Sequence, residues 1–168
     1  MVLFAKCITI ELAHFKGRFV VLAADQAAKS SIDATTPLGW SHPITPFFNL
    51  VHVLNPGAAF SFLAGAGGWQ RWFFLAIAVV ASVWLIWMLR QPRPRSDSLA
   101  FSLILGGALG NGFDRALRGQ VIDYLDFHLA GWHWPAFNVA DIAIVLGAAC
   151  LVLACFIATR QPQAQEKA

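Results

Sequence analysis

Two long apolar runs without a single charged side chain constrain this fold more than any other feature. They cover residues 72–89, WFFLAIAVVASVWLIWML, and residues 142–159, IAIVLGAACLVLACFIAT. An α-helix needs about 20 apolar residues to cross the hydrocarbon core of a bilayer, and about 17 suffice. Only 12% of the 168 residues are charged and 58% are hydrophobic, which leaves too little charge to cover a soluble domain. We therefore predict an integral membrane protein with spans at residues 72–89 and 140–159.

Two further segments are predicted to cross the membrane, with weaker apolar character. Residues 98–113, SLAFSLILGGALGNGF, are rich in glycine, and small side chains let membrane helices approach closely. Residues 15–31 carry charges near both ends, and Asp25 and Lys29 are four residues apart on one helix face, where they can pair. The predicted fold class is all-α: one membrane domain over residues 1–168, with four transmembrane helices and a small β-containing surface element.

The basic side chains indicate the orientation of the spans. Eight of the twelve lysines and arginines lie near the termini or in the segment RQPRPR, and four lie in the other two connections. Because cytoplasmic segments carry an excess of lysine and arginine, both termini are predicted to be cytoplasmic. The loops at residues 32–71 and 114–139 then share the opposite face. In the first of them, FFNLVHVLN (residues 47–55) ends at the turn signal NPG and predicts a short strand.

Several kinds of chemistry lack their usual sequence patterns. A net charge of +3, carried by residues beside apolar segments, is too small for a nucleic-acid surface. No serine stands in GxSxG, no histidine in HExxH, and GGALGNG lacks the lysine of a phosphate loop. The cysteines have no metal-binding spacing, and we expect Cys150 and Cys155 to be small buried hydrophobes. His128 and His133 fit polar tips at a membrane interface. We expect no metal, no organic cofactor and no nucleic-acid partner.

Acidic residues gather on one side of the predicted membrane. Five of the seven aspartates fall within a few residues of the face opposite the termini, and three asparagines accompany them. A carboxylate near lipid is costly, about 2.5–3.5 kcal/mol at the bilayer centre and less at the interface. One aspartate there is explained equally well as an anchor or an ion-pair partner, whereas five together favour a functional site. They are Asp25, Asp114, Asp123, Asp126 and Asp141, and the asparagines are Asn55, Asn111 and Asn138.

Two carboxyl groups close together in a poorly hydrated site can share one proton and activate a water molecule. The pattern therefore permits an aspartyl hydrolase, but it does not decide which two aspartates form the pair. Asn138 also fits the N-cap of the fourth span with Asp141 three residues later, which is a structural explanation for both. The alternative function is a small transporter or proton-linked channel, because carboxylates in membranes also mark ion paths. Clustering on one face, instead of a relay across the bilayer, argues against it.

Five blocks of the sequence resemble, in order and spacing, the prolipoprotein signal peptidases, also called type II or lipoprotein signal peptidases. They read DQAAKS (25–30), NPGAAFSFL (55–63), GGALGNGFDR (106–115), GQVIDYLDF (119–127) and FNVADIAI (137–144). The resemblance implies an aspartic endopeptidase of the bacterial inner membrane, with its active site on the periplasmic face. Such enzymes cut lipoprotein precursors just before a cysteine that carries diacylglycerol. The implied partners are lipidated precursors and membrane lipids, and we expect a monomer.

The resemblance also implies roles for individual residues. The catalytic pair is Asp123 and Asp141. Asp114 is a rival by position, but we expect it to support the site, paired with Arg115. Gly112 stands where the family often has a bulky apolar residue, which should loosen the end of the third helix by about 1 kcal/mol relative to alanine. Asn55 and Arg115 are candidate donors to a tetrahedral oxyanion. The residues expected to bind substrate or support the site are Asp25, Lys29, Asn55, Gly57, Asn111, Asp114, Arg115, Asn138 and Ala140.

Overall fold

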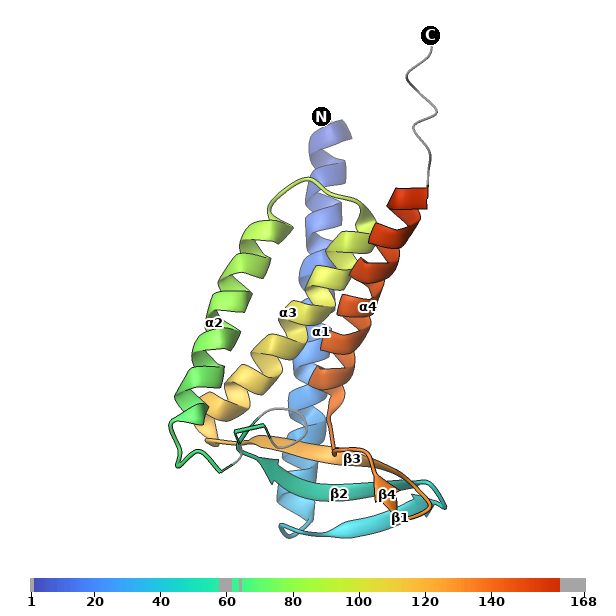
Figure 1. Ribbon diagram of the computed structural model, residues 1–168. Coiled ribbons are helices and arrows are strands. Elements are labelled where there is room, and N and C mark those ends of the chain that lie inside the picture. Colours follow the sequence, from blue (N-terminus) through green and yellow to red (C-terminus); the bar gives the residue numbers. More distant parts are fainter. Residues whose placement is uncertain (1, 58–61, 64, 161–168) are drawn as a thin grey trace.

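The computed structural model describes residues 2–57, 62–63 and 65–160. In this part of the chain there are four helices, with one small sheet at one end of them (Figure 1). The helices are α1 (Val2–Thr35), α2 (Gln70–Leu89), α3 (Arg95–Leu117) and α4 (Val139–Arg160). The strands are β1 (Ser41–Thr45), β2 (Phe48–Asn55), β3 (Val121–Leu129) and β4 (Trp132–His133). α1 begins and α4 ends at the end of the molecule away from the sheet (Figure 1). The predicted combination of helices with a small β-containing element is therefore observed.

α2 and α4 coincide with the two strongest predicted spans, and among the described residues they alone have the length and hydropathy to cross a membrane. Their apolar side chains point outward: Val80 on α2 is 69% exposed and Val145 on α4 is 65% exposed. Such surfaces suit contact with lipid, which is as apolar as the side chains themselves. Cys150 and Cys155 are exposed on this outer face of α4, so the expectation that they are buried is wrong.

α1 and α3 contain the two weaker predicted spans but extend beyond them. α1 has 34 residues and passes residues 15–31 at both ends, and α3 continues to Leu117 instead of ending at residue 113. α3 stays helical through Gly112. A Cβ at Gly112 would lie 3.2 Å from the Cβ of Ala78. The glycine thus gives α2 room to approach α3.

Glycines let α3 and α4 approach almost backbone to backbone, as the small residues of the third predicted span indicated. A Cβ at Gly107 of α3 would lie 2.3 Å from the carbonyl oxygen of Ala140. A Cβ at Gly147 of α4 would lie 2.6 Å from the carbonyl oxygen of Ala100. No side chain of any size fits at either position, so these two residues fix how closely the start of α4 lies beside α3.

The sheet is antiparallel throughout, in the order β1-β2-β3-β4. β2 confirms the strand predicted at residues 47–55, whereas β3 was not predicted. The register of β2 against β3 places Asn55 opposite Val121 and Val53 opposite Asp123. Because successive side chains of a strand point to opposite faces, Asp123 and Asp126 of β3 face opposite sides of the sheet. Only one of these two aspartates can therefore point toward the helices. Residues 58–61 of the block NPGAAFSFL lie outside the described residues.

Candidate active site

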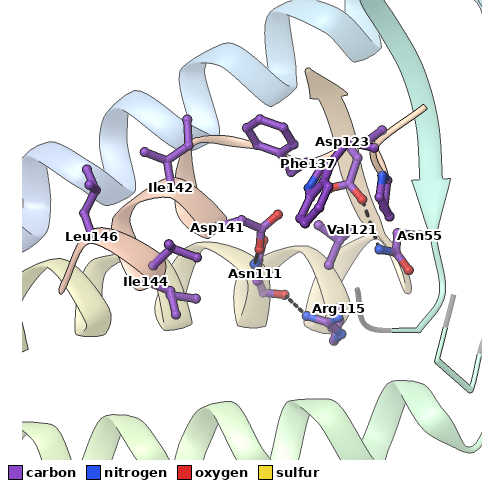
Figure 2. A pocket seen from close by; sticks show the side chains of 14 residues that line it. Asn55, Asn111, Arg115, Val121, Asp123, Phe137, Asp141, Ile142, Ile144 and Leu146 are labelled. Carbon is purple, nitrogen blue, oxygen red and sulfur yellow. Dashed lines mark hydrogen bonds between the residues drawn. The ribbon is translucent and has the colours of Figure 1, made fainter. Parts of the chain in front are cut away.

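Asp123 and Asp141 line the same cavity, which has a volume of about 640 Å³ (Figure 2). Asp123 comes from β3 and is 2% exposed, and Asp141 comes from the first turn of α4. Asn138 connects the two carboxylates. Its Nδ2 donates to Asp123 Oδ1 at 2.7 Å, and its backbone N–H donates to Asp141 Oδ2 at 3.2 Å. The two aspartates that the resemblance singled out are thus brought together.

Two further asparagines occupy the remaining carboxylate oxygens. Asn55 Nδ2, at the end of β2, donates to Asp123 Oδ2 at 3.0 Å. Asn111 Nδ2, from α3, donates to Asp141 Oδ1 at 2.7 Å. Both oxygens of both carboxylates therefore accept a hydrogen bond from an asparagine. This arrangement explains why asparagines and aspartates gather at the same face of the predicted membrane. It also fixes the orientation of both carboxylates.

The surroundings of Asp123 favour its protonated form. Burial raises the pKa of Asp123 to about 7, and the negative charge of Asp141 adds to the rise. The hydrogen bonds from Asn55 and Asn138, and the charge of Lys29, oppose it without cancelling it. Two neighbouring acids of this kind titrate as a unit. The pair is therefore suited to hold one proton near neutral pH, as acid–base work by two carboxyl groups requires.

Arg115, from α3, also lines the cavity. Its Nη2 donates to the carbonyl oxygen of Gly57 at 2.6 Å and its Nη1 to that of Asn111 at 3.3 Å. The guanidinium packs over the Phe74 ring, with Cζ 5.1 Å from the ring centre. Its Nε is buried and has no hydrogen-bond partner among the described residues. Gly57 is positioned in turn by its own N–H, which donates to Asn55 Oδ1 at 3.0 Å.

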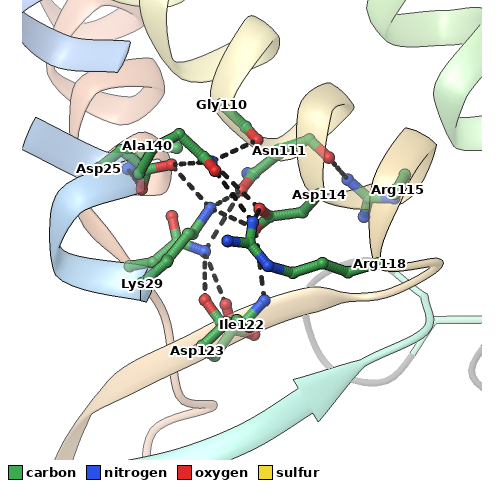
Figure 3. A network of polar contacts seen from close by, with 12 residues as sticks. Asp25, Lys29, Gly110, Asn111, Asp114, Arg115, Arg118, Ile122, Asp123 and Ala140 are labelled. Atoms are coloured by element: carbon green, nitrogen blue, oxygen red, sulfur yellow. Dashed lines mark hydrogen bonds and ion pairs between the residues drawn. The ribbon is translucent and has the colours of Figure 1, made fainter. Parts of the chain in front are cut away.

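Asp114 does not pair with Arg115, and this expectation is corrected. Consecutive residues of a helix point about 100° apart, so the two side chains leave α3 in different directions. Asp114 Oδ2 lies 2.8 Å from Lys29 Nζ, and Asp114 Oδ1 lies 2.5 Å from Arg118 Nη1 (Figure 3). Asp114 is fully buried and does not line the cavity that holds the other two acids. Asp114 therefore lies apart from Asp123 and Asp141 and pairs with Lys29 and Arg118 instead.

Lys29 is the centre of a buried polar network behind the cavity (Figure 3). Its Nζ lies 2.8 Å from Asp25 Oδ2, 2.8 Å from Asp114 Oδ2 and 2.9 Å from Asn111 Oδ1. All three donors of the ammonium group are thus used, which a fully buried lysine requires. Asp25 Oδ1 accepts the N–H of Ala140 at 2.9 Å, in the first turn of α4. The predicted pairing of Asp25 with Lys29 is confirmed.

Some polar residues at the sheet end lie outside the cavity, and two residues of the buried network were not predicted. Asp126 lies outside the cavity and contacts Asn49 Nδ2 at 2.8 Å and His133 Nδ1 at 2.9 Å, so His133 is a hydrogen-bond partner and more than a polar tip. Gln26 and Arg118 join the buried network but were not singled out. The spacing of Arg118, four residues after Asp114, was the available signal.

Apolar side chains form the rest of the cavity wall. On α4 they follow Asp141 toward the membrane-spanning part, and on the loop before α4 they include two aromatic rings; the residues are Ile142, Ile144, Val145, Leu146, Trp134 and Phe137. An apolar surface that begins at two acids and continues along a membrane helix can hold an apolar chain beside the reacting groups. Within the described ranges, no group of three or more His, Cys, Asp or Glu side chains has the geometry to hold a metal ion.

Comparison with known proteins decides the family. A family model described as signal peptidase (SPase) II matches residues 18–157. The chain belongs to the signal peptidase II family. It is 53% identical to the lipoprotein signal peptidase of Serratia marcescens over 133 residues, which cover 79% of this chain and 78% of that one. It is 55% identical to that of Ralstonia nicotianae over 130 residues, 77% and 75% of the two chains.

Solved structures agree with the signal peptidase II assignment. A bacterial membrane enzyme solved by the in meso method superposes with a TM-score of 0.82 and 29% identity, over 93% of this chain and 94% of that one. A second such structure gives a TM-score of 0.74 and 30% identity, over 85% and 92%. The predicted resemblance is therefore confirmed, and the chain is a member of a protease family with a membrane-enzyme fold. None of these comparisons favours the transporter alternative.

Proposed function

We propose that this chain is an aspartic endopeptidase that removes the signal peptide from diacylglyceryl-modified prolipoproteins, cutting just before the lipidated cysteine. The observation that carries the proposal is the pair formed by Asp123 and Asp141, which line one cavity and are oriented by three asparagines. The names of the relatives, lipoprotein signal peptidases, support the choice of substrate. The apolar wall that starts at Asp141 suits a substrate whose signal helix and acyl chains both remain in the lipid bilayer.

The proposed mechanism uses one water molecule and one proton shared by the two acids. The ionised carboxylate takes a proton from the water, whose oxygen attacks the carbonyl carbon before the cysteine. The protonated acid gives its proton to the carbonyl oxygen, which yields a neutral tetrahedral intermediate. When the C–N bond breaks, the proton taken from water passes to the leaving amine, and one hydroxyl of the intermediate returns its proton to the other carboxylate. The products are a carboxylic acid and an amine, and the pair again holds one proton. The raised pKa of Asp123, about 7, favours one proton on the pair near neutral pH.

Arg115 is the better of the two candidates for binding the carbonyl oxygen of the substrate. The side-chain amide of Asn55 already donates to Asp123, and this hydrogen bond holds it beside that carboxylate. Arg115 lines the same cavity, and its buried Nε has no partner among the described residues. A donor that is fixed in advance stabilises developing charge without reorganisation. Its positive charge also favours the ionised member of the acid pair.

We infer one membrane domain over residues 1–168, monomeric, in the bacterial inner membrane. α1 and α3 would cross beside α2 and α4, although their hydropathy is lower, because their polar residues pair with one another inside the bundle: Lys29 with Asp25 and Asp114. Intramembrane ionised groups are tolerated when they are paired and face the interior. With both termini cytoplasmic, the sheet and the acid pair would lie at the periplasmic face, where the lipidated cysteine is anchored.

Cleavage of a synthetic precursor peptide that carries diacylglyceryl cysteine tests the proposal directly. Purified wild-type protein in detergent should cut it before the cysteine, whereas Asp123→Asn and Asp141→Asn should bind detergent and fold normally but not cut. Asp126→Asn is the matched control, because Asp126 lies on the same strand but faces away from the cavity. If Asp123→Asn kept near-normal cleavage while folded Asp114→Asn lost it, the acid pair would be wrongly assigned. Ion flux through liposomes without peptide cleavage would support the transporter alternative instead.

A further inference from the structure

Arg118 ends α3 at the turn that leads into β3 and holds several groups at once. Its backbone N–H donates to the carbonyl oxygen of Asp114 at 2.7 Å, closing the last helical turn. Its guanidinium folds back over that turn, where Nη1 donates to Asp114 Oδ1 at 2.5 Å and to Gln26 Oε1 at 2.9 Å (Figure 3). Nη2 donates to Ser30 Oγ at 3.1 Å, and Nε lies 3.9 Å from Asp33 Oδ2.

The partners of Arg118 on α1 lie on one helix face. Gln26, Ser30 and Asp33 are separated by four and three residues, which brings them into one row along the helix. The donors of a guanidinium are spread over three nitrogens in a rigid fork, so they reach acceptors spaced along such a row, whereas the three donors of a lysine start from one nitrogen. Arg118 therefore fastens the sheet end of α1 to the last turn of α3.

Asp114 connects the last turn of α3 to β3, the strand that carries Asp123. Its Oδ2 accepts the Lys29 ammonium at 2.8 Å and the backbone N–H of Ile122 at 3.4 Å. Ile122 directly precedes Asp123, and its carbonyl oxygen accepts Asn138 Nδ2 at 3.4 Å, the same nitrogen that donates to Asp123. A shift of Asp114 would thus move the start of β3 relative to α4.

Arg118 also balances the charge of the buried network. Asp25 and Asp114 are fully buried, and Lys29 and Arg118 supply one positive charge each, so the four groups sum to zero. Without Arg118 the two carboxylates would share a single ammonium group. A net negative charge would then remain behind the acid pair, in a place where little water screens it.

We propose that Arg118 is a positioning residue for the acid pair: by clamping Asp114 to α1 it sets the place of β3, and with it Asp123, relative to Asp141. This inference rests on the proposed peptidase function and adds a residue to it. Arg118 does not line the cavity, so it acts through Asp114 and not on the substrate. Its loss should therefore lower the rate of the chemical step and leave substrate binding nearly unchanged.

The test compares Arg118→Gln and Arg118→Lys with wild type, using the diacylglyceryl peptide in detergent across a range of pH. Arg118→Gln should lower kcat about 10- to 100-fold with KM unchanged, as small misplacements of reacting groups do. It should also move the alkaline limb of the pH profile upward, because added negative charge disfavours ionisation of the pair. Arg118→Lys restores the charge but not the fork, so the alkaline limb should return to its wild-type position while kcat recovers only in part.

The titratable and charged groups that face this network come from every packed element. They are Asp25, Lys29 and Asp33 of α1, His52 of β2, Asp114 and Arg115 of α3, Asp123 and Tyr124 of β3 and Asp141 of α4. All of them are unchanged in the three proteins compared. A difference in pH profile among these proteins therefore reports the charge at position 118.

Arg71→Gln is the matched control, because it removes the same charge at the same end of α3. Arg71 donates to the carbonyl oxygens of Arg115 and Ala116 at 2.7 and 2.8 Å, but no carboxylate contact of its side chain is part of the network. It should lower Tm without moving the pH profile. Cleavage by wild type in the same assay tests the peptidase function separately. Wild-type kcat and pH profile in folded Arg118→Gln, or the same behaviour as Arg71→Gln, would overturn the positioning role.

Discussion

Asn138 and Asp141 cap each other at the start of α4. The Asp141 N–H donates to Asn138 Oδ1 at 3.0 Å, and the Asn138 N–H donates to Asp141 Oδ2 at 3.2 Å. This reciprocal pair satisfies two donors that a helix N-terminus leaves open. The side-chain nitrogen of Asn138 is then free to donate to Asp123. One residue therefore begins the helix and ties its acid to the acid of the strand.

Replacing Asn138 separates these two roles. Serine is as good an N-cap as asparagine, but its hydroxyl cannot accept from the Asp141 N–H and also reach Asp123 with a second polar group. Asn138→Ser should therefore keep the stability of wild type and lose most of the cleavage rate. Asn138→Ala should lose the rate and about 1 kcal/mol of stability as well. Unfolding and peptide cleavage measured on both variants check this; full activity of Asn138→Ser would show that the link to Asp123 is dispensable.

Cleavage should depend on pH through the proton shared by the pair. The pKa of Asp123 is raised to about 7 by burial and by the charge of Asp141. Above that pH the pair loses the proton that the mechanism gives to the carbonyl oxygen, so kcat/KM should fall with an alkaline limb near pH 7. Initial rates on a soluble lipidated peptide, from pH 5 to 9 at constant ionic strength, measure the limb. A rate that stayed constant up to pH 9 would contradict the shared proton.

The stability of the protein should change with pH for the same reason. Because the folded-state pKa of Asp123, about 7, lies above the ordinary 3.8, the native state binds more protons than the unfolded state between these values. The contribution of this bound proton to the stability of the folded state is fully present below pH 3.8 and is lost as pH rises through 7. Asp123→Asn removes this loss, so its stability relative to wild type should improve by up to about 4 kcal/mol from pH 4 to pH 8.

The comparison of the two pH series isolates this effect. Any packing or hydrogen-bond cost of Asp123→Asn that does not depend on pH shifts the whole difference by a constant, and the slope is unaffected. Unfolding in detergent at pH 4, 6 and 8 gives that slope. Asp126→Asn, on the same strand but outside the cavity, is the control. A difference between Asp123→Asn and wild type that stays constant with pH would show that Asp123 ionises freely in the native state.

Sequence patterns predicted the parts of this fold that depend on local periodicity, and they failed where distant segments meet. The uncharged runs of α2 and α4 and the strand β2 were predicted because each carries its own apolar pattern. β3 was not predicted because the buried Asp123 interrupts the alternation of apolar and polar side chains that marks a strand. Asp123 can be buried there because Asn55 and Asn138, from other elements, donate hydrogen bonds to it. The partner of Asp114 was predicted wrongly because neighbours in sequence are not neighbours around a helix.

Lys29→Met should destabilise the protein by about 3–5 kcal/mol, because it leaves two buried carboxylates with one partner too few. Lys29 is fully buried between Asp25 and Asp114. The double variant Lys29→Met/Asp25→Asn should recover part of this loss. An amide oxygen can still accept the Ala140 N–H, and Asp114 keeps Arg118. Unfolding measurements on both variants give the coupling; a double variant less stable than Lys29→Met would show that charge balance is not the main term.

Glycine at positions 107 and 147 should be required for the packing of α3 against α4. A Cβ at Gly107 would lie 2.3 Å from a backbone oxygen and 2.7 Å from the side chain of Ile144, and a Cβ at Gly147 would meet the backbone at 2.6 Å. Backbone cannot yield as a flexible side chain can, so each Gly→Ala should cost about 1–3 kcal/mol of stability, despite alanine's higher helix propensity. Activity should fall too, because α4 carries Asp141. Gly65→Ala is the control, since nothing lies within 4 Å of a Cβ there. Unchanged Tm in Gly107→Ala would mean that the helices are free to move apart without cost.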